Sequence, residues 1–189
     1  MNVGTDARKP VLGGTPMNAG YESTIVADEL LQLASKSNDT LTPMQLLKLV
    51  YLAHGWMLGI YGVPLIRESI EAWRYGPVIP DLYHKVKKFR DQPVDRSALS
   101  SGQQVESLGE REKKLIEDVY KKYGKLSGIQ LSMLTHKKGS PWDQCYEDGK
   151  RNIRISNDII EDYFGRLFQE YVRQVQEERD GGCLREAGK

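Results

Sequence analysis

Hydrophobic residues cover most of the circumference of one stretch, residues 42–61, and the rest of the chain is organised around it. Thr42 is placed to cap a helix, Pro43 occupies the first helical position, and Gln45 completes a capping box. Gly62 follows and can take the left-handed conformation that ends a helix. Because a helix that is apolar on nearly every side is a buried one, the pattern predicts a central core helix over residues 42–61.

Two glycines stand inside this predicted helix. Gly55 and Gly59 lie four residues apart, so they open one stripe of the helix to the close approach of a neighbour. Each glycine costs the helix roughly 1 kcal/mol relative to alanine. Packing against another element is the plainest compensation for that cost.

Apolar residues at helical spacing predict further helices on both sides of the central one. The expected helices cover residues 23–36, 81–89, 110–123, 128–136, a short turn from residue 140, and 156–178. Residues 66–78 differ, because β-branched and aromatic residues there lead to a turn at Gly76-Pro77 and predict a short strand or extended arm. The predicted fold class is therefore mainly α, a compact helical domain around one buried central helix.

The two ends of the chain lack this periodicity. Residues 1–20 mix glycine, proline and polar residues, which predicts a disordered leader. Residues 180–189 are glycine-rich and predict a flexible tail. Between them, residues 21–179 are expected to form a single domain, the usual arrangement for a chain of 189 residues.

Composition excludes several functional classes. The net charge of +1 provides no global basic field of the kind that dominates nucleic-acid affinity. Cys145 and Cys183 lie far apart without a disulfide or metal-ligand pattern, which suits a reducing cytoplasm. Lys48 and His54 interrupt the central helix, and no signal-peptide core begins the chain, so no membrane association is expected.

Motifs for catalysis or cofactor binding are absent from the sequence. His54, His84 and His136 show no metal-ligand spacing, and no GxSxG or glycine-rich phosphate loop occurs. Cys145 stands beside Trp142 without a sequence signal for a base. The sequence thus predicts no catalytic residues, no metal, no cofactor and no enzymatic activity.

Two predicted helices joined at residues 124–126 resemble a helix-turn-helix, which leaves a DNA-binding regulator as an alternative. An ordinary pair of antiparallel helices is far more common, and the near-neutral charge favours it. The side chains on or just after the second helix that could contact DNA are Gln130, Ser132, Thr135, Lys137 and Lys138.

A series of short motifs resembles the Panacea domain family, which includes SocA-like and phage-associated GepA-like proteins. The motifs are LTPMxLxKLxYxAHG at residues 41–55, EAWRYGPV at 71–78, LY at 82–83, YGKLS at 123–127, LTH at 134–136 and SPW at 140–142. Many members of this family are antitoxins. The resemblance covers roughly residues 23–168, and its specificity comes from the order of the motifs rather than from any one of them.

This resemblance implies a bacterial, phage or mobile-element antitoxin of a type II-like toxin–antitoxin system. Such a protein neutralises a cognate protein toxin, encoded by an adjacent gene, through direct binding in the cytoplasm. Homo-oligomers are compatible with this role, and nucleic acid is not an expected partner. Aromatic and arginine side chains at turns are typical interface anchors, and the candidate toxin-binding residues are Arg74, Tyr75, Tyr83, His136 and Trp142.

Overall fold

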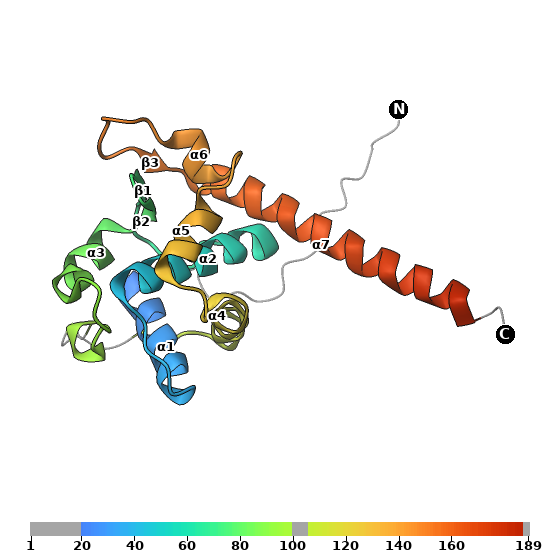
Figure 1. Cartoon of the computed structure of the whole chain (residues 1–189), viewed down its shortest axis with the longest axis horizontal. Helices are drawn as coiled ribbons and strands as arrows, with labels where there is room; N and C mark the ends of the chain where they lie inside the picture. Colours follow the sequence, from blue (N-terminus) through green and yellow to red (C-terminus); the bar gives the residue numbers. More distant parts are fainter. Residues whose placement is uncertain (1–19, 100–105, 187–189) are drawn as a thin grey trace, which may run out of the picture.

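The computed structural model describes residues 20–99 and 106–186, with side chains up to residue 178. Within these ranges the protein is mainly α-helical, as predicted, with one small sheet (Figure 1). The elements are α1 (Ser23–Lys36), α2 (Pro43–Tyr61), β1 (Ile70–Trp73), β2 (Gly76–Val78), α3 (Pro80–Val86), the 3₁₀-helices η1 (Lys87–Phe89) and η2 (Arg96–Leu99), α4 (Glu110–Tyr123), α5 (Gly128–Thr135), α6 (Pro141–Cys145), β3 (Arg154–Ile155) and α7 (Asn157–Glu186). The predicted leader lies, up to residue 19, outside the described residues.

Helix α2 forms the centre of the fold, and its predicted ends are confirmed. The Thr42 hydroxyl accepts a hydrogen bond from the Gln45 backbone N–H, and the Thr42 N–H donates to Gln45 Oε1 at 3.0 Å. Gly62 ends the helix with a φ of 66°. Helices α1, α3, α4, α5 and α7 all pack against α2 (Figure 1). Neither α2 nor any other described helix combines the length and apolar character that crossing a bilayer requires.

Helix α7 crosses α2 at the two glycines that the sequence singled out. A Cβ atom added to Gly59 would lie 2.5 Å from the Phe164 carbonyl carbon and 2.7 Å from the Gly165 nitrogen. A Cβ atom added to Gly55 would overlap the Phe164 ring, which packs edge-to-face on Trp56 at 5.2 Å. The glycines therefore let the two helix backbones approach closely. The sequence predicted a close neighbour along this stripe, and in the structure that neighbour is α7.

The predicted arm at residues 66–78 is the β1–β2 hairpin. The sheet has the order β2-β1-β3, and β1 pairs antiparallel with both neighbours. Strand β3 has only two residues, and sequence patterning did not predict it. It forms because the buried Ile155 pairs with Ile70 across the sheet, a contact between segments far apart in sequence.

Two helix ends differ from the predicted ones by more than one residue. Helix α3 ends at Val86, and the chain continues as the 3₁₀-helix η1 to Phe89. Helix α7 continues past residue 178 to Glu186, so the expected tail at 180–189 overlaps its last turns, while residues 187–189 lie outside the described chain. The first half of α7 packs on the core through Ile160 and Phe164, and its second half projects away from the other helices (Figure 1).

Candidate functional site

The β1–β2 hairpin turns at Arg74 and Tyr75, directly before Gly76. Gly76 has a φ of 104°, a conformation that other residues rarely adopt. A Cβ atom there would also lie 2.9 Å from Lys48 Nζ and 3.0 Å from Thr135 Oγ1. The tight turn therefore depends on glycine, both for its backbone conformation and for the close approach of α2 and α5.

Side chains from three helices bind the carbonyl oxygens of this turn, residues 73–77, which we call the hairpin tip. The four contacts are Trp142 Nε1–H donating to the Trp73 oxygen at 2.7 Å, His136 Nε2 beside the Arg74 oxygen at 3.3 Å, the Ser132 hydroxyl donating to the Tyr75 oxygen at 3.1 Å, and Lys48 Nζ donating to the Pro77 oxygen at 3.0 Å. Backbone carbonyls that leave a sheet ladder need such partners. The tip is thus held in one conformation by α2, α5 and α6.

Aromatic rings stack beside the tip. The His136 and Trp142 rings lie 3.8 Å apart between centroids, and the Tyr146 ring stacks on Trp142 at 4.5 Å. On β1, Trp73 packs edge-to-face on Tyr83 of α3 at 4.9 Å. Because these rings interlock with one another, they stiffen the region in which the tip is presented.

The structure brings four of the five predicted residues together. Arg74 and Tyr75 are exposed at the tip, and His136 and Trp142 support it from below. Tyr83 is half-buried and packs edge-to-face on Trp73, where the tip begins, so it takes part in packing rather than lying exposed at the turn. Among the four, Tyr75 is the most accessible ring, with 63% of its surface exposed.

Two residues beside the tip were missed by the sequence reasoning. Ile129 and Met133 of α5 are 70% and 68% exposed, although both are large and apolar. They occupy the helix stripe next to Ser132 and His136, which contact the tip, while Leu131 is buried on another face. The available signal was that α5 has more apolar residues than one core-facing stripe can use.

The tip surface is therefore defined by Tyr75, Ile129 and Met133, with Arg74 at its edge. The Arg74 guanidinium lies over the Tyr75 ring, 5.7 Å from its centroid. Exposed aromatic, methionine and arginine side chains are the kinds of residue that protein interfaces favour. Chemically the surface offers apolar contact area and hydrogen-bonding groups.

Buried ionisable groups lie behind the surface. Lys48 is 2% exposed, and this burial lowers the pKa of its ammonium group to about 7. Its bond to the Pro77 oxygen ties the base of the tip to the central helix. Lys48 was known from the sequence only as a polar interruption of α2, whereas the structure shows that it supports the hairpin.

His54 belongs to the core. Its Nδ1 accepts the Ile66 N–H at 3.2 Å, so its Nε2–H donates to Asn157 Oδ1 at 3.0 Å. Burial lowers the pKa of this imidazole to about 4. Burial also raises the pKa of the Cys145 thiol. Within the described part of the chain, no three His, Cys, Asp or Glu side chains gather closely enough to share a metal ion.

Comparison with known proteins agrees with the motif resemblance. The family model described as "Antitoxin SocA-like, Panacea domain" matches residues 46–143, a span that contains the hairpin and α5. Antitoxin SocA from Caulobacter vibrioides (strain NA1000 / CB15N) is 30% identical over 154 residues, covering 76% of this chain and 82% of that protein. No solved structure matches the chain significantly.

Proposed function

Because the chain belongs to the family of SocA-like antitoxins with a Panacea domain, we propose that it is an antitoxin that binds its cognate toxin directly. In this proposal the toxin is a protein encoded by an adjacent gene, and neutralisation is stoichiometric, as in type II-like systems. Both proteins act in the cytoplasm, where a chain with two widely spaced cysteines needs no disulfide. The antitoxin performs no catalysis.

The observation that carries this proposal is the exposed apolar tip surface. Tyr75, Ile129 and Met133 each leave more than 60% of their surface in contact with solvent. Burying such side chains against a partner removes apolar area from water, at roughly 25 cal/mol per Å². They contribute little to the fold in their present positions, so a partner is the plainest reason for their exposure.

Rigid support strengthens the case for the tip surface. The hydrogen bonds of Ser132 and Trp142 hold the backbone of the turn, while the Tyr75 ring stays outside. Binding therefore costs little ordering of the main chain, which preserves affinity. Aromatic and methionine anchors on a preformed backbone are typical of interface hot spots.

The helix-turn-helix alternative leads to a different expectation for α5. A recognition helix presents polar side chains to base edges, whereas α5 exposes two large apolar side chains, Ile129 and Met133. A gel shift with the protein's own promoter region, run at low and high salt, compares the two functions. A sequence-specific, salt-sensitive shift in the absence of toxin would favour the regulator.

Co-expression with the adjacent gene tests the proposal. The neighbour's product should arrest growth alone, be harmless with the antitoxin, and purify with it in a fixed ratio. Tyr75→Ala should weaken this complex by about 1–2 kcal/mol, the range of an interface anchor, and leave the melting temperature unchanged. Tyr171→Ala is the matched control, because Tyr171 is also an exposed tyrosine (58%) but lies on α7.

Three results would overturn the proposal or its placement. Stoichiometric neutralisation would be contradicted if the product of the adjacent gene did not arrest growth. It would also be contradicted if far less antitoxin than toxin restored growth. If Tyr171→Ala weakened the complex while Tyr75→Ala did not, the binding surface would lie on α7.

Tyr83→Ala is expected to lower stability along with binding, since the Tyr83 ring packs on Trp73.

A further inference from the structure

A groove of about 660 Å³ opens beside the tip surface, between the β1–β2 hairpin and the loop that precedes β3. A hydrogen bond joins the two sides of the groove, from the Ala72 N–H to the Ile153 oxygen at 2.8 Å. The residues that line it are Ala72, Trp73 and Arg74 on one side and Tyr146, Asp148, Gly149, Lys150, Arg151 and Asn152 on the other.

The groove is positively charged, although the chain as a whole carries a net charge of only +1. Arg74, Lys150 and Arg151 line it together with a single carboxylate, Asp148, which accepts a hydrogen bond from the Tyr146 hydroxyl at 3.1 Å. Lys150 forms an ion pair with Glu147. Among the described residues, no carboxylate oxygen lies within 4 Å of the Arg74 or Arg151 guanidinium.

A second group of cations follows α5. Lys137 and Lys138 are exposed, and no described carboxylate pairs with either of them. They come directly after His136, which contacts the Arg74 oxygen at the tip. Cations that pair with no carboxylate among residues 20–99 and 106–178 therefore occur both in the groove, at Arg74 and Arg151, and directly after α5.

We infer that the groove receives an acidic segment of the toxin, next to the contacts that the tip surface makes. This inference rests on the proposed antitoxin function and adds the chemistry of the partner. Guanidinium groups bind carboxylates through paired hydrogen bonds, and in the described part of the chain no carboxylate occupies Arg74 or Arg151 in this way. Arg74 belongs to both regions, since it lines the groove and lies over the Tyr75 ring.

Charge complementarity of this kind acts mainly on the rate of association and on the choice of partner. The affinity of the complex should consequently fall as salt is added, because exposed charges are screened over about 8 Å at physiological ionic strength. A partner that docked on the apolar residues alone would show little dependence on salt.

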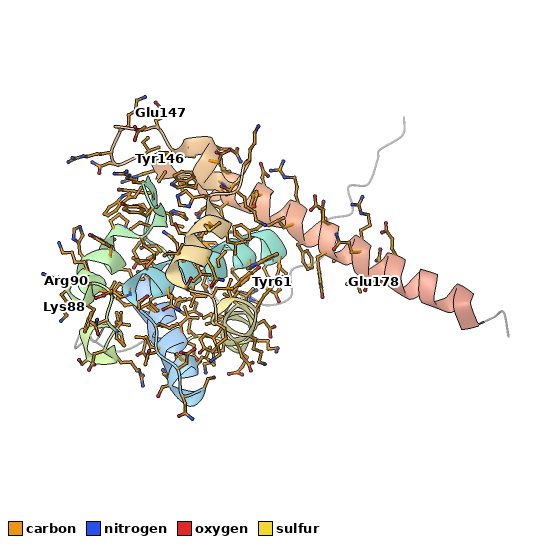
Figure 2. All side chains as sticks on the ribbon, in the orientation of Figure 1. Tyr61, Lys88, Arg90, Tyr146, Glu147 and Glu178 are labelled. Atoms are coloured by element: carbon orange, nitrogen blue, oxygen red, sulfur yellow. The ribbon has the colours of Figure 1, made fainter. Side chains whose placement is uncertain are left out.

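The test is charge reversal in the groove with a matched reversal elsewhere. Arg74→Glu/Arg151→Glu should weaken binding of the neighbour-encoded toxin at least tenfold, chiefly through slower association, and should abolish most of the salt dependence. Lys85→Glu/Lys88→Glu makes the same change in net charge on α3 and η1. Figure 2 places Lys88 and Arg90 on a different side of the molecule from Tyr146 and Glu147, so this control should stay within about twofold of wild type.

All four replaced side chains are exposed, so both variants should keep the wild-type melting temperature. A selection for toxin variants that again bind Arg74→Glu/Arg151→Glu should return replacements of aspartate or glutamate by lysine or arginine. Kinetic binding measurements at 50 and 300 mM salt supply the direct comparison.

The possible failures are separable. If the toxin binds wild type and the groove variant equally well and without salt dependence, the groove inference falls and the antitoxin function stands. If the neighbour's product binds neither protein, both fall. If a labelled single-stranded oligonucleotide binds wild type and is lost in the groove variant while toxin binding is unchanged, the groove serves nucleic acid and the inference is again overturned.

Discussion

The crossing of α2 and α7 and the hairpin tip are held together in opposite ways. At the crossing, Gly59 lets the α2 backbone approach the α7 backbone at Phe164 and Gly165, and the Phe164 ring fills the space beside Gly55. At the tip, the backbone is fixed by directional hydrogen bonds from side chains such as Trp142 and Lys48, while apolar side chains remain outside. Packing thus secures the core, and polar bonds secure a surface whose apolar groups stay available to a partner.

This contrast predicts where the largest loss of stability will occur. Gly59→Ala should lower the free energy of unfolding by about 3 kcal/mol or more, because the new methyl group meets backbone atoms that cannot move aside. Gly165→Ala is the matched control in the same crossing, since its Cβ would meet nothing closer than 3.7 Å, and alanine favours a helix. Chemical denaturation of both variants measures the difference.

Equal stabilities for these two variants would show that α2 and α7 can move apart to accept a methyl group. The distinction between a tightly packed crossing and a hydrogen-bonded tip would then be contradicted. The thermal midpoint should follow the same order, with a decrease of roughly 2–4 °C per kcal/mol for a chain of this size.

Acid should lower the free energy of unfolding through His54, by somewhat less than the Gly59→Ala substitution does. The pKa of His54 is about 4 in the folded protein and 6.5 in the unfolded chain, so the unfolded state binds more protons between these values. The stability contributed by the neutral imidazole is therefore fully present above pH 6.5 and is lost as pH falls towards 4. The expected loss over this range is about 2–3 kcal/mol.

Unfolding measured against pH for wild type and His54→Gln checks this expectation, because the variant should lack the part of the acid dependence that comes from His54. The exposed His84 provides a control, and His84→Gln should reproduce the wild-type profile. Identical profiles for all three proteins would contradict a neutral, buried His54.

The tip should give the smallest change in stability. Trp142→Phe keeps a stacking ring but removes the N–H that binds the Trp73 oxygen, which should cost about 1 kcal/mol. Amide hydrogen exchange should become faster in the hairpin, residues 70–78, and remain unchanged in α2 and α7. A uniform acceleration across all three elements would mean that the tip and the core unfold as one unit.

Local sequence determined much of the fold. The capping box at Thr42 and the stop at Gly62 depend on residues a few positions apart, and both occur as predicted. The glycine stripe of α2 also identified a close helix contact. Arg74 and Tyr75 were candidates because they stand beside the predicted turn at Gly76-Pro77, and that turn is the hairpin tip. Local geometry decides each of these features, so a single sequence is enough to recognise them.

Other features depend on segments that meet only in the folded chain. The N–H and hydroxyl of Ser23, at the start of α1, donate to Glu68 Oε1, both at 2.7 Å, although 45 positions separate the two residues. The exposure of Ile129 and Met133 follows from which side of α5 meets the core, and pattern alone leaves that choice open because α5 is apolar on more than one side. The charged groove exists only because the hairpin and the loop before β3 lie side by side. Sequence therefore determined the helices and the capped ends of α2, and the tertiary structure decided which residues a partner can reach, because burial is set by contacts between distant segments.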